Sequence, residues 1–395
     1  VSRMKPIVAM CPGQGSQVVG MADVYQGRSP EIRAAFEEAS EVLGTDLRSA
    51  AGDPDQLRHT EITQPAILAF GVGMYRAFVT QTGVAPQALA GHSLGEYTAL
   101  VCGNALDFAD AIRIIGRRGE LMGRAGRERP SGMVSVHGVT RADVEQALTR
   151  WPHLALACDN SPVEFVVAGD NGALDDFLDA ASRRSWRTTR LCVAGGFHSP
   201  AMQSVVNDFR AVFETVTFRT PTCDVYCNVT ASPYQAADEI PGELARQITQ
   251  PVRWRETIER LTVRPSLLVD LGPSQTLSKM VRNSWGFAGT VPLHTGEASL
   301  ADALVHFPEL LSGARGRMAN WALRQVAATP VGATAGVAEV DACTRTVTSL
   351  VERYECSKAH ESKLVDAVDA LLVAKRISEV ERHRRLDQAP RLVER

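Results

Sequence analysis

One serine stands alone in the stretch Gly91-His92-Ser93-Leu94-Gly95. A G-x-S-x-G pattern between a strand and a helix makes a turn tight enough to expose the serine hydroxyl, because glycine tolerates the backbone angles that such a turn needs. The apolar residues 86–90 before it are typical of a buried strand, and apolar residues recur three and four apart after it, as in a helix. The five residues alone leave a second interpretation equally open, in which Ser93 only caps a helix.

A serine nucleophile needs a base within hydrogen-bond reach and donors for the oxyanion. Of the nine histidines, His198 differs because it lies in the glycine-punctuated junction VAGGFHSPAM, which is expected to face a cleft between two subdomains. It is therefore the best candidate for the base. We expect His92 to be structural, because neighbouring side chains on a tight turn point apart. The others have no distinctive surroundings: His59, His137, His153, His294, His306, His360 and His383.

The gross properties favour a cytoplasmic enzyme. With 395 residues the chain exceeds one typical domain, and its net charge of -3 argues against nucleic acid as the main partner. The eight cysteines are scattered, mostly in apolar runs, which is typical of reduced core thiols. Cys223 and Cys227 lack the second pair of ligands that a zinc site needs, so no metal is expected. We identify neither a secretory signal nor an apolar run of the roughly 18 residues that span a membrane.

The order of elements predicts an α/β fold with an inserted subdomain. Strand and helix patterns alternate over residues 1–130 and again over 198–312, as in a parallel-sheet layer. Between them, residues 131–197 follow the order β-α-β-β-α-β of a ferredoxin-like unit. Residues 313–395 begin with a small-residue linker and continue as a helical extension. Its expected apolar helix face contains Leu364, Val368, Leu371 and Leu372.

A set of ordered motifs carries a family resemblance. In chain order they are CPGQGSQ, GHSLGEYTAL, RRGELM, NSPVEFVVAG, GGFHSPAM, CNVTA, RQITQPVRW and DLGPSQTLSKM. Together they resemble the malonyl-CoA:acyl carrier protein transacylases, a family that includes the acyltransferases of fatty-acid and polyketide synthesis. The resemblance covers about residues 5–310. It implies an α/β-hydrolase-like core, and it favours a discrete, trans-acting acyltransferase of polyketide synthesis.

The resemblance implies a role for each catalytic residue. Ser93 would form the acyl-enzyme, with His198 as its base, and the backbone carbonyl of Gln247 would orient that histidine. The backbone N–H groups of Gln14 and Leu94 would form the oxyanion hole. The assignment of Leu94 also follows from the geometry of a G-x-S-x-G turn.

Arg118, in RRGELM, matches the arginine with which the family grips the free carboxylate of the acyl group. A guanidinium makes a bidentate, charge-assisted pair with a carboxylate, which a lysine would not reproduce. Spacing alone would favour a solvated helix arginine beside Arg117, and only the motif context favours function. The resemblance adds four further substrate-binding residues: His92, Met122, Asn160 and Phe197.

Three departures from the family pattern bear on acyl specificity: Gly123, Gly196 and the C-terminal extension. The two glycines are expected to leave more room or less pairing near the substrate. Phe197 resembles the bulky residue of malonyl-selective members, so we expect malonyl to be preferred over methylmalonyl. A basic surface for the acidic carrier protein is predicted in ASRRSWRTTR, with merely solvated charge as the equal alternative: Arg183, Arg184, Arg187 and Arg190.

The predicted activity is a ping-pong transfer of malonyl, or a related dicarboxylic acyl group, from CoA to the phosphopantetheine thiol of an acyl carrier protein. Acyl-CoA would be a substrate and no cofactor would be bound. The main alternative is an acyl-thioester hydrolase, in which water is the second acceptor. A general esterase and a non-catalytic carrier-binding scaffold are weaker alternatives. The first would need an HGGG-type loop in place of GQGSQ, and the second would not need Ser93, His198 and Arg118.

Overall fold

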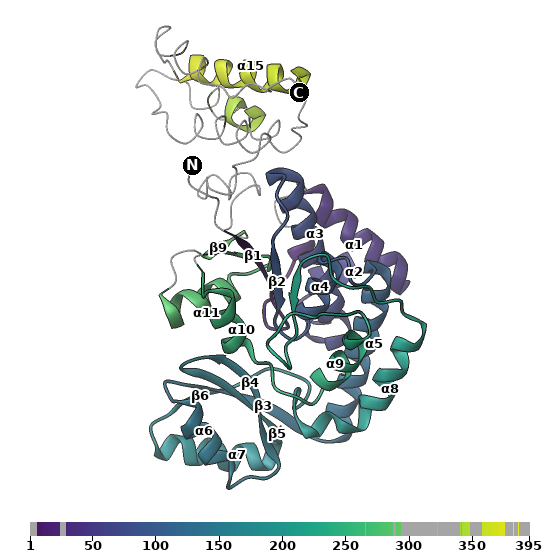
Figure 1. Ribbon diagram of the computed structural model, residues 1–395, viewed down its shortest axis with the longest axis vertical. Coiled ribbons are helices and arrows are strands. Elements are labelled where there is room, and N and C mark those ends of the chain that lie inside the picture. The colour runs from purple at the N-terminus through teal and green to yellow at the C-terminus, as the bar shows by residue number, and fades with distance from the viewer. Residues whose placement is uncertain are drawn as a thin grey trace.

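The protein is described by a computed structural model. It describes residues 6–23, 29–264, 266–286, 290–293, 322, 340, 342–347, 358–375, 382 and 386. Two sheets organise the catalytic part of the chain, and both are visible in Figure 1.

The larger sheet has five strands in the order β7-β2-β1-β8-β9. They are β1 (Ile7–Cys11), β2 (Ala88–Gly91), β7 (Asp224–Tyr226), β8 (Leu267–Asp270) and β9 (Thr290–Pro292). Every pairing between them is parallel. Parallel strands are covered on both faces, which explains why they appear in the sequence as continuous apolar runs. The predicted parallel α/β layer is confirmed.

Helices lie on both sides of this sheet (Figure 1). Those that precede the small sheet in the chain are α1 (Pro30–Leu43), α2 (Leu47–Gly52), α3 (Thr60–Thr82), α4 (Gly95–Cys102) and α5 (Phe108–Glu128). Those that follow it are α8 (Val206–Ala211), α9 (Glu239–Gln247), α10 (Trp254–Leu261) and α11 (Thr276–Trp285).

Helix α3 is long and largely apolar, although polar residues such as Gln64 and Arg76 interrupt its apolar run. It has 23 residues, and its most apolar window reaches a mean hydropathy of 1.2, so by length and composition it is able to cross a membrane. In the fold, 78% of that window is buried, and α3 packs against α1, α4 and α5. Its apolar residues are therefore explained by its position as a core helix.

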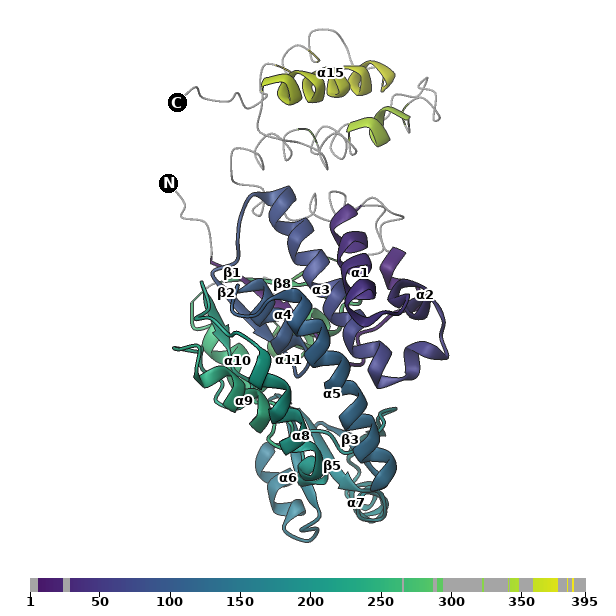
Figure 2. The same cartoon turned by 90° about the vertical axis from the view of Figure 1, so that its right-hand side faces the viewer.

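The smaller sheet is antiparallel, with the order β4-β5-β3-β6. Figure 2 shows it beyond the end of α5, with its two helices packed on it. Its residues run in the order β-α-β-β-α-β: β3 (Ser131–His137), α6 (Arg141–Leu148), β4 (Leu154–Ser161), β5 (Glu164–Asp170), α7 (Asn171–Arg183) and β6 (Arg187–Arg190). This is the order that the sequence predicted for the inserted subdomain. A separate apolar core lies between these helices and the sheet.

In the C-terminal extension, α15 (Lys358–Ala374) is a helix. The side chains expected on its apolar face, from Leu364 to Leu372, are buried. Most of 313–395 lies outside the described residues, as does the end of the 198–312 segment from residue 294 on.

The seven described cysteines are free thiols. Cys11, Cys102, Cys158 and Cys227 are buried, as expected for core residues. Cys192 is exposed, although it was expected in a buried apolar run.

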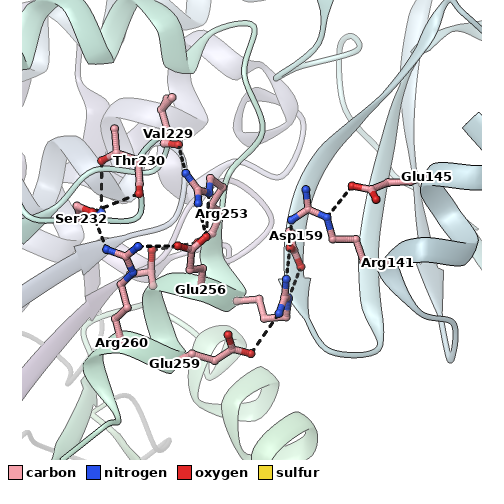
Figure 3. A network of polar contacts seen from close by, with 12 residues as sticks. Arg141, Glu145, Asp159, Val229, Thr230, Ser232, Arg253, Glu256, Glu259 and Arg260 are labelled. Carbon is pink, nitrogen blue, oxygen red and sulfur yellow. Dashed lines mark hydrogen bonds and ion pairs between the residues drawn. The ribbon is translucent and has the colours of Figure 1, made fainter.

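A buried ion pair joins the two sheets' subdomains (Figure 3). The carboxylate of Asp159, on β4, is 3% exposed and accepts two bonds from Arg255 of α10, from Nε at 2.9 Å and from Nη2 at 3.0 Å. Arg141 of α6 donates a third bond at 3.0 Å. The backbone N–H of Asp159 also donates to the carbonyl oxygen of Val252 at 2.9 Å. This carboxylate therefore fixes the small sheet against the segment that leads into α10.

Replacing the shared carboxylate should weaken this connection. We expect Asp159→Ala to lower the free energy of unfolding by about 1.5–3 kcal/mol, the usual range for lost hydrogen bonds to charged groups. The lower end is expected, because both arginines are partly exposed and remain hydrated. Urea unfolding followed by circular dichroism measures the change.

Glu145→Ala is the matched control, because Glu145 pairs with the same Arg141 but is 51% exposed. It should change stability by only a few tenths of a kcal/mol. Equal losses in the two variants would show that burial of Asp159 adds nothing to the connection.

Candidate active site

Ser93 lies at the turn between β2 and α4, in the left-handed backbone conformation with φ 54°. A Cβ on Gly91 would lie 1.9 Å from the carbonyl carbon of Gly95, and a Cβ on Gly95 would lie 1.9 Å from the carbonyl oxygen of Cys11. Only glycine fits at either position. The backbone N–H of Ser93 donates to Asn228 Oδ1 at 2.7 Å, which fixes the turn against the loop after β7. The turn thus exposes the hydroxyl, as the strand-to-helix pattern predicted.

The hydroxyl of Ser93 lies against an oriented imidazole. Ser93 Oγ is 2.6 Å from His198 Nε2, and His198 Nδ1 is 2.7 Å from the carbonyl oxygen of Gln247. Gln247 is the last residue of α9, where helix carbonyls lack intrahelical partners. Since a carbonyl only accepts, Nδ1 carries the proton and Nε2 is left to accept from the serine hydroxyl.

The imidazole of His198 is buried, with 3% of its surface exposed. Burial is the main cause that lowers its pKa, from 6.5 to about 3, and the positive charge of Arg118 lowers it further. His198 is therefore neutral, and able to accept a proton, well into the acidic range.

Two backbone N–H groups lie beside this pair without partners. The loop after β1 packs directly on the turn, since a Cβ on Gly13 would lie 2.5 Å from the carbonyl oxygen of His92. Gln14, next in that loop, lines the same cavity as Ser93. Within the described part of the chain, neither the N–H of Gln14 nor that of Leu94 makes a hydrogen bond. Leu94 precedes the first turn of α4, where N–H groups are unpaired.

The guanidinium of Arg118 is buried next to the serine. It is 1% exposed, and its Nη2 donates to Ser93 Oγ at 3.1 Å and to Gln247 Oε1 at 3.0 Å. Nη1 donates to Gln64 Oε1 at 2.8 Å. Among the described residues, no carboxylate forms an ion pair with Arg118, and its Nε has no partner. Burial of a cation without an anion is unfavourable, so the site is suited to an anionic ligand.

A cavity of about 360 Å³ opens over Ser93 between the two sheets. Polar residues on its wall include His92, whose Nε2 is 2.8 Å from Asn160 Oδ1. His92 also packs edge-on against Trp254, so it contacts the cavity and braces the turn at once. Phe197 contributes an aromatic ring, and the remaining wall is largely apolar: Met133, Val166, Leu191, Val193, Leu277 and Met280.

The structure does not bring every predicted residue to this cavity. Met122 and Arg118 are both buried in α5 and are not among the lining residues, but Arg118 reaches the site through its contact with Ser93 Oγ. A Cβ on Gly123 would approach Arg127 and Glu61, and one on Gly196 would lie 3.1 Å from the backbone nitrogen of Gly169. Both glycines therefore face other parts of the protein, and neither enlarges the acyl site as expected.

The four arginines of the basic segment are exposed, and the segment immediately precedes residues that line the cavity. Arg187 and Arg190 lie on the edge strand β6, directly before the lining residue Leu191. Arg190 pairs with Asp175, and Arg184 stacks on Trp186 at 5.4 Å. Among the described side chains, Arg183 and Arg187 have no ion-pair partner.

Three polar residues complete the site although the sequence predicted no role for them: Gln64, Glu96 and Asn228. Their signal is a polar side chain inside an otherwise apolar segment, as Gln64 is in TQPAILAF. All are buried at 5% exposure or less. Buried polar groups require partners, and here those partners are Arg118, Gln247 and the turn of Ser93.

This arrangement is suited to attack on a carbonyl group. A neutral base accepts the serine proton, Gln14 lines the same cavity, the N–H of Leu94 directly follows the nucleophile in the chain, and a buried cation lies 3.1 Å from the nucleophile. Such a site favours a substrate in which a reactive carbonyl and an anionic group are close together.

Comparisons with known proteins agree with this chemistry. The family model described as "Acyl transferase domain" matches residues 8–289. A malonyl CoA-acyl carrier protein transacylase of Bacillus subtilis is 32% identical over 298 residues, covering 73% of this chain and 74% of that protein.

Two solved structures are also similar. The malonyl CoA-acyl carrier protein transacylase of Coxiella burnetii is 30% identical, with a TM-score of 0.72 and coverage of 78% of this chain and 98% of the other. A malonyl-transacylase in complex with a type II polyketide synthase acyl carrier protein is 33% identical, also with a TM-score of 0.72, and covers 76% and 99% of the two chains.

The lowered pKa of His198 predicts how the reactivity of Ser93 depends on pH. A histidine with the ordinary pKa of 6.5 would lose roughly nine-tenths of its neutral form by about pH 5.5. With a pKa of about 3, His198 stays neutral there. The rate at which a fluorophosphonate probe labels Ser93 should therefore change less than about twofold between pH 8 and pH 5.5. A fall of about tenfold over that range would refute the prediction.

Proposed function

This chain belongs to the acyl transferase domain family, among the malonyl-CoA:acyl carrier protein transacylases, and we propose that it moves malonyl from CoA to a carrier protein through an acyl-enzyme on Ser93. The observation that carries this proposal is the buried guanidinium of Arg118, which lies 3.1 Å from the serine oxygen and forms no ion pair with a carboxylate of the described residues. A carboxylate there would supply the missing anion, while the thioester carbonyl of the same short acyl group reaches the nucleophile.

In the first half-reaction, His198 Nε2 takes the proton of Ser93 as the oxygen attacks the thioester carbonyl carbon of malonyl-CoA. The oxyanion accepts hydrogen bonds from the N–H groups of Gln14 and Leu94. When the intermediate collapses, the carbon–sulfur bond breaks and the proton passes from His198 to the sulfur of CoA. The Gln247 carbonyl keeps the imidazole in the tautomer required and stabilises its transient positive charge.

The second half-reaction reverses these roles. His198 takes the proton of the carrier's phosphopantetheine thiol, and the thiolate attacks the malonyl ester of Ser93. The ester bond breaks, and the proton returns to the serine oxygen. No bound cofactor is needed, since CoA and the carrier's phosphopantetheine arm are both substrates.

Acyl selectivity depends on two residues, one that binds the carboxylate of the acyl group and one that limits the space at its α-carbon. Arg118 pairs with the terminal carboxylate, and Phe197 limits the space beside the α-carbon. His92 and Asn160 line the wall along which the rest of the substrate lies. A methyl branch would overpack against the ring, which typically costs about 1–3 kcal/mol. Malonyl should therefore be loaded in preference to acetyl, which lacks the anion, and to methylmalonyl, which carries the branch.

The hydrolase alternative has no comparable support. An enzyme that clears plain acyl chains has no use for a buried cation, which is unfavourable when unpaired. The polyketide carrier in one solved relative supports polyketide synthesis as the proposed pathway. We place the enzyme in the cytoplasm, in keeping with its free cysteines.

The proposed function is tested with Arg118→Ala. Malonyl loading should fall by at least about 30-fold, because losing one partner of a buried charge pair costs about 2–5 kcal/mol. Acetyl loading should fall much less, since it makes no such pair. Intact-mass kinetics with malonyl-, methylmalonyl- and acetyl-CoA measure each adduct.

Ser93→Ala is the control that places the adduct, and it should remove all three masses. Wild-type protein should load methylmalonyl more slowly than malonyl. If Arg118→Ala keeps the wild-type ratio of malonyl to acetyl, Arg118 does not recognise the carboxylate and the proposal fails.

We further propose that the carrier protein docks on the basic segment around Arg183, Arg184, Arg187 and Arg190. Carrier proteins are typically acidic, and β6 leads directly into the cavity wall at Leu191. Because Arg183 and Arg187 have no ion-pair partner among the described side chains, they are the residues most available to acidic groups. Exposed charges of this kind act mainly on association rate.

Reversing both charges, with Arg183→Glu and Arg187→Glu together, should slow malonyl transfer to the carrier, and more so at low salt. Loading of Ser93 from malonyl-CoA should not change. The control variant reverses the charges of Arg33 and Arg58. These arginines are also exposed, but they lie in the N-terminal part of the chain, before α3. An equal effect of both double variants on transfer would point to net charge instead of a docking surface.

A further inference from the structure

Glu96 is a buried carboxylate that the reaction described above does not use. It lies three residues after Ser93, in the first turn of α4, and is 1% exposed. Its Oε1 accepts bonds from the hydroxyl of Tyr234 at 2.5 Å and the backbone N–H of Asn228 at 3.3 Å, and its Oε2 accepts from Gln247 Nε2 at 2.6 Å. No lysine or arginine forms an ion pair with it among the described residues. Neutral donors alone hold this charge.

Three contacts, one of them with Glu96, fix which way the amide of Gln247 faces. Gln247 Nε2 donates both its hydrogens, to Glu96 Oε2 at 2.6 Å and to the carbonyl oxygen of Ser93 at 2.9 Å. Its Oε1 accepts from Arg118 Nη2 at 3.0 Å. A flipped amide would turn its oxygen toward two acceptors and its N–H groups toward a guanidinium, which only donates. An ionised Glu96, which only accepts, therefore adds to the preference that Arg118 and the Ser93 carbonyl already impose for an amide oxygen directed at Arg118.

Arg118 is consequently held without being neutralised. Its partners are two amide oxygens and one hydroxyl oxygen, from Gln64, Gln247 and Ser93, and none of them carries charge. Burial lowers the pKa of Arg118, and Tyr97 and then Glu96 oppose that shift. The Glu96 carboxylate lies behind the Gln247 amide and does not contact the guanidinium directly. A carboxylate in direct contact would take the place that an anionic substrate needs. The Glu96 carboxylate is separated from Arg118 by the Gln247 amide. It therefore stabilises the cation and leaves the place for the substrate carboxylate open.

We infer that Glu96 is a positioning residue for acyl selectivity, which locks the Gln247 amide and through it aims the Arg118 guanidinium at the substrate carboxylate. This inference rests on the proposed function, since it concerns how that same site selects dicarboxylic acyl groups. It implies that removing the charge of Glu96 disturbs malonyl loading more than acetyl loading.

Protonation of Glu96 provides a second test, because it should make acyl selectivity depend on pH. Burial raises its pKa from 4.5 to about 7, although its hydrogen bonds oppose the shift. The other titratable groups around Glu96 change charge outside the pH range in which Glu96 titrates. The pKa of Cys227 is raised to about 12, those of Tyr97 and Tyr234 are raised above 10, that of His198 is lowered to about 3, and Arg118 stays charged. As pH falls through about 7, Glu96 gains a proton and loses its hold on the amide, so selectivity for malonyl should decrease.

The test compares Glu96→Gln with Tyr234→Phe by intact-mass kinetics, using malonyl- and acetyl-CoA. In Glu96→Gln we expect the malonyl-to-acetyl ratio to fall about tenfold, with acetyl loading within about threefold of wild type. Tyr234→Phe is the matched control at pH 9, because it removes a bond to the same carboxylate but keeps the Gln247 contact. Loss of the Tyr234 bond raises the pKa of Glu96 further, so this comparison is made well above neutral pH, where the carboxylate stays ionised. Its ratio should stay at the wild-type value.

Wild-type protein supplies a measurement that does not depend on any variant folding. Its malonyl-to-acetyl ratio should decrease between pH 8 and pH 6, whereas the ratio of Glu96→Gln should stay constant. Equal losses of both loadings in Glu96→Gln, or a wild-type ratio independent of pH, would reduce Glu96 to a structural brace and overturn the inference. Absence of malonyl loading by wild-type protein would instead refute the proposed function itself.

Discussion

The guanidinium of Arg118 lies in the interior, where no carboxylate of the described residues pairs with it, and the rest of the site is arranged around that charge. Two glutamine amides hold it, Gln64 from α3 and Gln247 from α9, so its position is defined while its charge is kept. The same charge helps to lower the pKa of His198 and so keeps the base neutral. One buried cation thus contacts the nucleophile and acts on the base, and it is the group that we propose to bind the substrate carboxylate.

The turn at Ser93 makes this arrangement achievable. Its left-handed conformation, with φ 54°, directs the hydroxyl away from the sheet, and glycines on either side allow β1, β2 and α4 to approach closely. Strained conformations of this kind persist only when neighbouring groups over-determine them. Here Asn228 bonds the N–H of Ser93 and the carbonyl of Gly91, and Gln247 bonds the carbonyl of Ser93. The residues that brace the turn therefore also belong to the network around Arg118.

Residues from both sheets and their connecting loops line the cavity. The large sheet supplies the serine turn and the loop of Gln14, whereas the wall opposite comes largely from the small sheet and its return segment, which leads to Phe197 and His198. The position of one relative to the other therefore sets the width of the site. Asp159 and Val252 make that connection a few residues from Asn160 and Gln247, so stability of the junction and geometry of the site are linked.

Sequence by itself determined the features that depend on neighbours in the chain. The glycines around Ser93 predict the turn because backbone angles are local, and the alternation of strand and helix patterns predicts the two layers. Family motifs singled out His198, Gln247 and Arg118. Tertiary structure alone decided how Gln64, Glu96 and Asn228 complete the site and that Met122 does not reach the cavity. Asn228 meets Ser93 from 135 positions away, and Gln247 meets Glu96 from 151. A polar side chain in an apolar segment indicates that it needs a hydrogen-bond partner. Which partner it finds depends on how distant segments pack, and no local pattern contains that information.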